Sequence, residues 1–358
     1  MSSNINPALP VAGTPTTQSV RDNFAAAKNE IDALQLLAGR LLSNFSIVTS
    51  RAANAETIAI KTAAGADPSA ADPVRIAFRN ADPTLGDYSI LQVTAPANLT
   101  ISAGSTLGAT NSTAFRLWLV SFNDAGVFRL AIIKCALSDG IFGLQDDAIE
   151  SSTAEGGAGA ADSAGVFYTD APVADRAMRV LGYLEYTLTT AGTWNAAPSL
   201  ISIYSHGDRL PGETVQVRHS QTGAFAASFT TIPHDDTIPQ NTEGVEFMAQ
   251  TITPKSRINI LEVHHIGQYN NSVQATVIVA LFQDNNADAF AAAGAMDGAN
   301  YQRNINIRHS RVAGTTSPTT FKVRAGGSSG TVHFNASAGT RIYGGVSASS
   351  LKITEIMV

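Results

Sequence analysis

The only sustained helical period in the chain lies between Thr17 and Leu42, and its repeat is seven residues. Apolar residues recur there at alternating steps of four and three, as the a and d positions of a coiled coil do. The positions of this seam are Val20, Phe24, Ala27, Ile31, Leu34, Ala38 and Leu41. We therefore expect one amphipathic helix of about three heptads.

The residues in and beside the seam favour three chains over two. Ala27 and Ala38 make the seam too weak to hold alone, so association of the domains that follow must support it. Leu36, Leu37 and Leu42 widen the apolar face beyond the stripe of a dimer. The alternative is a single amphipathic helix that packs on its own domain.

After Leu42 the pattern changes to short apolar or alternating runs that end at turn residues such as Asp82-Pro83, which is typical of antiparallel β-structure. We expect the following segments: an extended arm over 1–16, a coiled-coil helix over 17–44, a middle β-sandwich over 45–206, a linker and hairpin over 207–230, and a jelly-roll-like knob over 231–358. The hairpin is expected to pair Thr214–His219 with Ala224–Thr230. The predicted fold class is therefore mainly β, with an N-terminal coiled-coil helix followed by two antiparallel β-sandwich domains, in a trimer.

The composition and the apolar runs of the chain argue against binding to nucleic acid and against insertion into a membrane. The formal charge is -6 and only 15% of residues are charged, with no block of Lys and Arg, which argues against nucleic-acid binding. The N-terminus lacks a basic region followed by an apolar one, and the longest apolar run, Ala275–Phe282, is far too short to span a membrane. Cys135, the single cysteine, lies in an apolar run and is expected to be buried and inert. We expect a chain made in the cytoplasm that does not insert into membranes.

Three motifs resemble known catalytic or metal-binding sites, but the residues around each of them do not fit such a site. Gly326–Gly330 has the spacing of a nucleophile elbow, but strands are expected on both sides of it, so a glycine-rich turn is the better interpretation. Asp284–Asp288 begins like an EF-hand loop, yet alanines stand where glycine and a bidentate glutamate are needed. His264 and His265 are adjacent on a strand, so they point to opposite faces and cannot ligate one ion together. We expect no enzyme activity, no cofactor and no metal, although a pair of carboxylates from distant strands would not be visible in the sequence.

Three parts of the chain, which together cover most of it, resemble bacteriophage and prophage fibre proteins. The part at the N-terminus looks like a segment shared by many phage virion proteins, the middle part looks like a module of predicted tail fibres, and the last part looks like a C-terminal fibre module. The residues that carry the resemblance are Pro15–Phe24, then Phe115–Gly126 with Ser151–Asp162, and then Asp235–Gly244, Thr320–Gly327 and Tyr343–Ile356. The resemblance implies a trimeric fibre attached to the virion, with a distal binding knob, and it carries over no individual receptor residue.

From these observations we expect a structural adhesin located in the virion. Its arm and helix would contact another virion protein, and its knob would contact a glycan or protein of the host surface. Candidate receptor contacts are polar and aromatic residues of expected knob loops, namely Tyr269, Asn270, Asn271, Asp284, Asn286, Asp288, Asp297 and Tyr301. The alternatives are a capsid-mounted head fibre or decoration protein without a dedicated receptor, and a depolymerase of surface polysaccharide.

Overall fold

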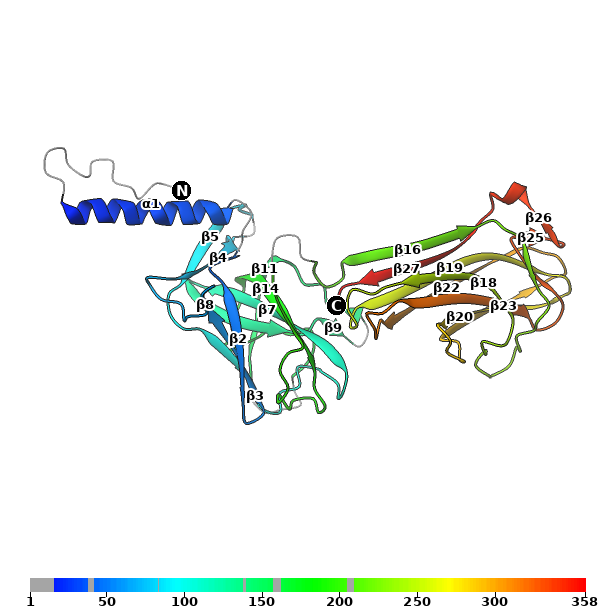
Figure 1. Ribbon diagram of the computed structural model, residues 1–358, viewed down its shortest axis with the longest axis horizontal. Coiled ribbons are helices and arrows are strands. Elements are labelled where there is room, and N and C mark those ends of the chain that lie inside the picture. Colours follow the sequence, from blue (N-terminus) through cyan, green and yellow to red (C-terminus); the bar gives the residue numbers. More distant parts are fainter. Residues whose placement is uncertain (1–15, 38–41, 83, 138–139, 157–161, 205–208) are drawn as a thin grey trace. The chain divides into compact units, whose positions relative to one another are not determined.

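The computed structural model describes residues 16–37, 42–82, 84–137, 140–156, 162–204 and 209–358, without the side chains of Glu30, residues 32–37 and Asp297. The chain is mainly β with one N-terminal α-helix, which confirms that part of the predicted fold class (Figure 1). It divides into two compact units, Met1–Leu210 and Pro211–Val358.

The helix α1 spans Thr17–Leu37. The predicted end at residue 44 is wrong, because Leu42 and Ser43 form the short strand β1, which pairs with β4 (Val74–Arg79), and Leu42 packs against the core of the first unit. It begins after Thr16, whose hydroxyl oxygen accepts a hydrogen bond from the backbone N–H of Ser19 at 3.1 Å, as an N-cap residue does. Two seam residues are strongly exposed, with 73% of Phe24 and 53% of Ile31 accessible. Of the other seam positions, the side chain of Leu34 and all of Ala38 and Leu41 lie outside the described residues. Of the four seam side chains that the structure describes, Phe24 and Ile31 are therefore largely uncovered in the single chain, whereas Val20 and Ala27 are half-buried.

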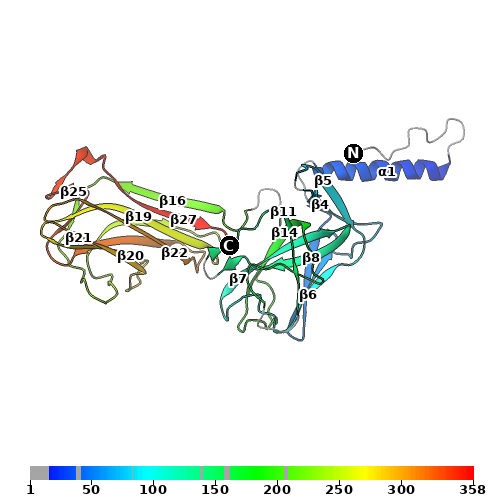
Figure 2. The same ribbon diagram turned by 180° about the vertical axis from the view of Figure 1, so that it is seen from behind.

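The first unit contains three main sheets. One has the order β1-β4-β5, a second β2-β3-β6, and the third β11-β14-β7-β8-β13-β12, with β15 also paired to β14 and a separate β9–β10 pair. Their bounds are β1 Leu42–Ser43, β2 Ser46–Ala52, β3 Ala55–Lys61, β4 Val74–Arg79, β5 Tyr88–Val93, β6 Asn98–Ile101, β7 Ala114–Asp124, β8 Val127–Ile133, β9 Ala136–Leu137, β10 Gly140–Ile141, β11 Asp147–Glu150, β12 Thr153–Ala154, β13 Tyr168–Thr169, β14 Arg176–Thr187 and β15 Leu200–Ile203. The long strands β7 and β14 form the centre of the largest sheet, as the views from both sides show (Figures 1 and 2).

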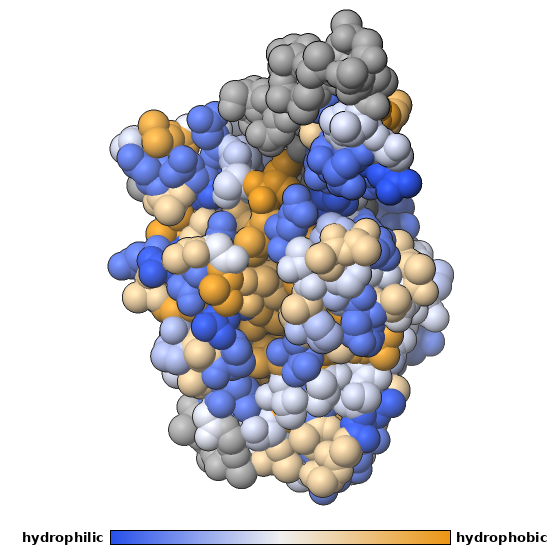
Figure 3. Space-filling view, turned by 90° about the vertical axis from the view of Figure 1, so that its left-hand side faces the viewer, coloured by the Kyte–Doolittle hydropathy of each residue, from blue (hydrophilic) through white to orange (hydrophobic). Residues whose placement is uncertain are grey.

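Apolar side chains cover both faces of β7. Phe115, Leu117 and Leu119 belong to the main core, which also takes residues from β3, β4, β6, β8 and β14. The alternate residues Trp118 and Phe122 are equally buried. This is the burial that a near-continuous apolar strand predicts. Partly buried apolar residues pack against the main core. The space-filling view shows hydrophobic residues that lie deeper than the hydrophilic residues on either side of them (Figure 3).

Cys135 follows β8 and is 1% exposed, which confirms the prediction of a buried thiol. Burial raises the pKa of this thiol to about 12, because a thiolate would lose its hydration there. The reactive thiolate form is therefore scarce at neutral pH.

The second unit is a two-sheet sandwich. One sheet has β27 and β19 at its centre, flanked by β16 and β22 and extended by β24 and β17, and the other has the order β18-β23-β20-β21. The core lies between them and takes apolar residues from both sheets. The bounds are β16 Thr214–Thr222, β17 Ala226–Ser228, β18 Val245–Ile252, β19 Ile260–Asn271, β20 Ala275–Gln283, β21 Ala291–Asp297, β22 Arg303–Val312, β23 Thr319–Gly327, β24 Val332–Phe334, β25 Ala336–Ser337, β26 Thr340–Arg341 and β27 Ser349–Ile356, with a short 3-10 helix η1 at Tyr343–Gly345.

The predicted hairpin within 207–230 is wrong, although the boundary between the two units, at Leu210 and Pro211, falls inside the predicted linker. β16 does not pair with the segment that follows it but with β27, from Thr214 opposite Ile356 to Thr222 opposite Ser349. The short strand β17 pairs instead with β24. Both strands belong to the second unit, which begins at Pro211. The long ladder with the C-terminal strand offers β16 far more backbone hydrogen bonds than a hairpin with three-residue β17 would.

Candidate functional site

Tyr269, Asn270 and Asn271 do not form the exposed turn that the sequence suggested. All three lie within β19 and are 0% exposed. The Tyr269 ring contacts Phe334 in the core at a centroid distance of 5.4 Å, and the amide of Asn271 donates to the carbonyl of Ser329 at 2.8 Å. Their predicted placement on an exposed loop is therefore wrong. The sequence predicted that the strand ends at His265, but β19 continues for six more residues, to Asn271.

Asp284, Asn286 and Asp288 are exposed in the turn between β20 and β21, as expected. The carboxylate of Asp284, however, accepts hydrogen bonds from the backbone N–H of Thr320 at 2.7 Å and from the hydroxyl of Thr319 at 2.8 Å. Asp288 accepts one from the amide of Gln240 at 3.0 Å. Two of the three side chains therefore hold the turn in place.

This turn also lies at the end of the second unit where the chain enters. The entry end is defined by residues 212–214, 259–260 and 356–357, which are joined by ladder and backbone hydrogen bonds. The register of β20 with β23, and of β23 with β18, places Gln283 and Ile252 near this end. The opposite end of the unit, which we call the far end, holds residues 222–225, 271–275, 298–302 and 335–348.

The far end carries a group of exposed aromatic and apolar side chains. Tyr301, a predicted contact, is 70% exposed there. Four further side chains there, which the sequence pattern does not single out as contacts, are Phe225 at 43%, Val273 at 41%, Tyr343 at 72% and Val346 at 86% exposure. Their loops are neighbours, because the backbones of Gly223 and Gly345 are in contact and the amide of Gln302 donates to the carbonyl of Ala336 at 3.3 Å.

Tyr343 has a strained backbone as well as an exposed ring. Its φ is +49°, a left-handed conformation that is rare for a bulky residue and that the surrounding structure must hold. Large exposed aromatic side chains on a rigid scaffold are typical anchors of binding surfaces. The glycine-rich sequence Tyr343-Gly-Gly345 was the one local signal for such a loop. The side chain of the last predicted contact, Asp297, lies outside the described residues.

A second feature is a cavity of about 540 Å³ in the first unit. Its walls come from the ends of β4 and β5, from the turn between β7 and β8, and from the start of β14. The lining residues are Arg79, Asn80, Ala81, Asp87, Tyr88, Ser89, Asn123, Ala125, Gly126, Arg176 and Ala177. The volume falls within the roughly 300–1,000 Å³ of small-ligand sites.

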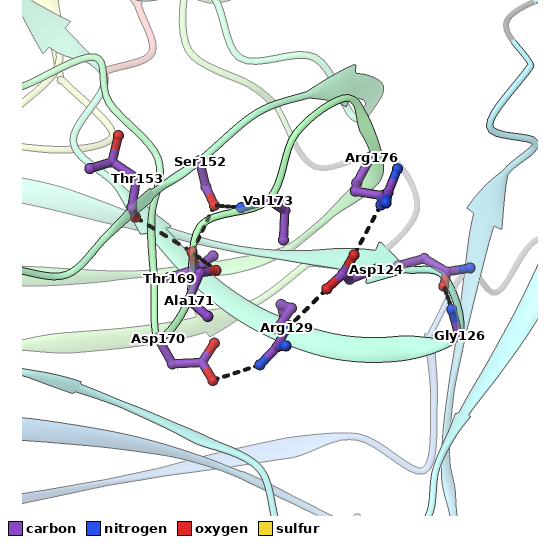
Figure 4. Close-up of polar contacts among 11 residues, drawn as sticks. Asp124, Gly126, Arg129, Ser152, Thr153, Thr169, Asp170, Ala171, Val173 and Arg176 are labelled. Atoms are coloured by element: carbon purple, nitrogen blue, oxygen red, sulfur yellow. Dashed lines mark hydrogen bonds and ion pairs between the residues drawn. The ribbon is translucent and has the colours of Figure 1, made fainter.

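An alternating chain of charges fixes one wall of this cavity (Figure 4). The carboxylate of Asp124 accepts a hydrogen bond from Nε of Arg176 at 3.0 Å and lies 3.5 Å from Nε of Arg129. Arg129 in turn donates to Asp170 at 2.9 Å. The hydrogen bond from Arg176, assisted by Arg129, holds the pKa of Asp124 below its ordinary value, so Asp124 stays ionised at neutral pH. Arg176 is thereby oriented at the cavity wall.

Within the described ranges, His, Cys, Asp and Glu side chains form no group of three or more that could hold a metal ion. A search of the same part of the chain finds no helix long and apolar enough to cross a membrane.

Comparison with known proteins identifies no family. No protein-family model and no curated protein matches the chain. Among solved structures, a chain of the infectious bursal disease virus structure (Gx strain) is 11% identical in sequence to this chain, with a TM-score of 0.21. The match covers 88% of this chain and 77% of the viral one. The insecticidal delta-endotoxin Cry8Ea1 of Bacillus thuringiensis is 8% identical, with a TM-score of 0.22 and coverages of 90% and 55%. An exo-beta-1,3-galactanase of Phanerochaete chrysosporium is 9% identical, with a TM-score of 0.19 and coverages of 87% and 81%. Such scores are too low to support an argument about fold or function.

Proposed function

We propose that the protein is a structural fibre of a phage virion, a homotrimer whose N-terminal helix attaches to the particle and whose second unit contacts the host surface. The observation that carries the proposal is the exposed heptad stripe of α1, with Phe24 and Ile31 more than half accessible, ahead of two β-units. Apolar side chains of this size in a regular stripe gain free energy when other helices cover them. The resemblance of the sequence to phage fibre proteins supports the same assignment.

We infer that the second unit is a jelly roll. Its eight long strands, taken in chain order as one to eight, lie in the orders one-eight-three-six and two-seven-four-five in the two sheets. Two nested Greek keys produce these orders. Such a sandwich is rigid, so loops at its ends keep a constant shape on which contacts are built.

We place host recognition at the far end of this unit. The reasons are the exposed rings of Tyr301 and Tyr343 and their distance, along every long strand, from the entry end at Pro211. Asp284 and Asp288 are less suitable, because their carboxylates are bound within the fold at the entry end. Three copies of the surface in one fibre would add avidity to modest single contacts.

The trimer is tested by measuring the mass of the full-length protein in solution at micromolar concentration. A mass of three chains supports the proposal, whereas a monomer or dimer contradicts it. Attachment is tested by deleting residues 1–16, which should leave a soluble trimer that no longer enters particles. Normal incorporation of the shortened chain would show that the arm does not dock.

Recognition is tested with the full-length double variant Tyr301→Ser and Tyr343→Ser, added as a competitor of phage adsorption to host cells. The wild-type protein should compete and the variant should not. The matched control is Val312→Ser, which removes a residue that is 54% exposed near the entry end and should change nothing. Equal competition by the double variant and the wild type would exclude the far end as the binding surface.

A further inference from the structure

The cavity of the first unit contains a fixed aromatic platform. The ring of Tyr88 is 47% exposed and lines the cavity, while the guanidinium of Arg179 lies over the ring, 5.5 Å from its centroid. Arg179 is itself 0% exposed and is held by the carbonyl of Ala77 at 2.8 Å and by Asp146 at 2.8 Å. One face of the tyrosine is thus covered by an immobile cation.

The hydroxyl of Tyr88 is also occupied inside the protein. It donates a hydrogen bond to the carboxylate of Asp147 at 2.7 Å. This hydrogen bond, together with partial burial, raises the pKa of Tyr88, so the phenol keeps its proton at neutral pH. With its hydroxyl and one face engaged, the ring presents its remaining surface to the cavity in a fixed orientation, which lowers the entropic cost of binding a ligand.

Two asparagines beside this ring are oriented by their own turns. The side-chain oxygen of Asn80 accepts from the backbone N–H of Asp82 at 3.0 Å, and that of Asn123 accepts from Gly126 at 2.8 Å. An asparagine whose oxygen is bound in this way keeps its NH₂ group as a donor. Both asparagines line the cavity, so each amide can offer donors to a ligand there.

The charges around the cavity balance. Arg79 and Arg176 line it together with the exposed Asp87, and Asp124 lies behind Arg176. The set supplies hydrogen-bond donors and an acceptor without a strong net potential, which disfavours a highly charged ligand. A sugar ring fits this set, because its hydroxyls both donate and accept while its C–H face packs on an aromatic ring.

We propose that this cavity binds a sugar unit of a neutral saccharide, stacked on Tyr88 and hydrogen-bonded by the side chains around it. The site lies in the first unit and is separate from the far-end surface of the second unit. It does not depend on the proposed host recognition. A fibre that failed to bind cells through its far end would still bind a saccharide here.

The test is direct binding of the full-length protein to an immobilised panel of neutral oligosaccharides built from hexoses and N-acetylhexosamines, followed by ligand-observed NMR of any hit. Wild type should bind at least one member. The variants Tyr88→Leu and Asp87→Asn should each weaken that binding about tenfold or more. Asp87 is exposed, so its variant retains the fold even if Tyr88→Leu does not.

The matched control is Leu200→Ala, which removes a side chain of the first unit that is 44% exposed, pairs with Glu185 away from the cavity, and should leave saccharide binding unchanged. The inference is overturned if wild type binds no neutral saccharide at millimolar concentration, if it binds only polyanionic glycans, or if both cavity variants bind like wild type. Loss of saccharide binding in the far-end double variant Tyr301→Ser and Tyr343→Ser, with both cavity variants unchanged, would assign the binding to the far end instead.

Discussion

The hydroxyl of Tyr269 donates a hydrogen bond to Nε2 of His265 across a distance of 2.7 Å, inside the core of the second unit. The direction follows from the other ring nitrogen, Nδ1, which lies 2.8 Å from the carbonyl of Ser350 and must therefore carry the proton. Gly267 lies between the two residues on the same face of β19. A Cβ there would lie 2.5 Å from both rings, so glycine is what permits this contact.

We predict that Gly267→Ala and Tyr269→Phe each destabilise the second unit. Either change leaves Nε2 of buried His265 without its donor, which costs about 1–3 kcal/mol. Hydrogen exchange of the β19 backbone amides in increasing denaturant measures the loss, because both tryptophans, Trp118 and Trp194, lie in the first unit. Tyr301→Phe is the control and should be neutral, because that side chain is 70% exposed. Unchanged stability in Tyr269→Phe would mean that the hydrogen bond contributes nothing.

Acid should destabilise the second unit through His265. Burial lowers the pKa of this imidazole from 6.5 to about 4, so the folded state binds fewer protons than the unfolded state between these values. Stability therefore rises with pH across this window and falls by about 3 kcal/mol on acidification from pH 6.5 to 4. We expect His265→Gln to flatten the dependence of unfolding free energy on pH. The variant His219→Gln, at an exposed position of the same unit, should keep the slope, and equal slopes in both variants would contradict the assignment.

Glu56 should have the opposite influence on the first unit. Its side chain is 0% exposed, and burial raises its pKa above 4.5, although hydrogen bonds from Thr49, Arg51 and Tyr186 oppose the rise. The folded state then holds the proton more tightly, so this contribution to stability is present below pH 4.5 and is lost as pH rises through the raised pKa. Glu56→Gln should remove this slope. The exposed Glu213→Gln is the control, and a slope that survives Glu56→Gln would refute the account.

Charge in the seam of α1 should abolish the proposed trimer. The double variant Phe24→Asp and Ile31→Asp places like charges at core positions of the proposed coiled coil, where they cannot be hydrated without separating the helices. Light scattering should then report a single chain. Ala25→Asp adds charge to an exposed position off the seam and should leave the assembly intact. A trimer in the double variant would show that the β-units alone hold the chains together.

Cys135 should resist thiol reagents until the first unit unfolds. The side chain is 1% exposed and burial raises its pKa to about 12. A reagent therefore cannot reach the sulfur, and almost no thiolate is present to react with it. Labelling with an aromatic disulfide at pH 8 should be slow in native protein and immediate in denaturant. Rapid labelling of native protein would show that the wall around Cys135 opens.

Local patterns in the sequence determined the parts of this protein that depend on near neighbours. The heptad spacing around Phe24 predicted α1, and alternating runs predicted a mainly β chain, because side-chain periods of about 3.6 and 2 residues follow from backbone geometry alone. Period two also placed His264 and His265 on opposite faces, and His265 is indeed buried while His264 is partly exposed. The apolar run around Cys135 predicted its burial for the same reason.

Only the tertiary structure decided which strands pair and which loops meet. β16, the first strand of the second unit, pairs with β27, its last strand in the sequence. Because of this pairing the second unit begins at Pro211 and not, as the sequence predicted, at residue 231. Tyr301 and Tyr343 both lie at the far end, and Tyr88 and Asn123 both line the cavity, because segments far apart in the chain are in contact there. Such contacts depend on closing long loops and on a shared core, neither of which leaves a periodic trace in the residues concerned.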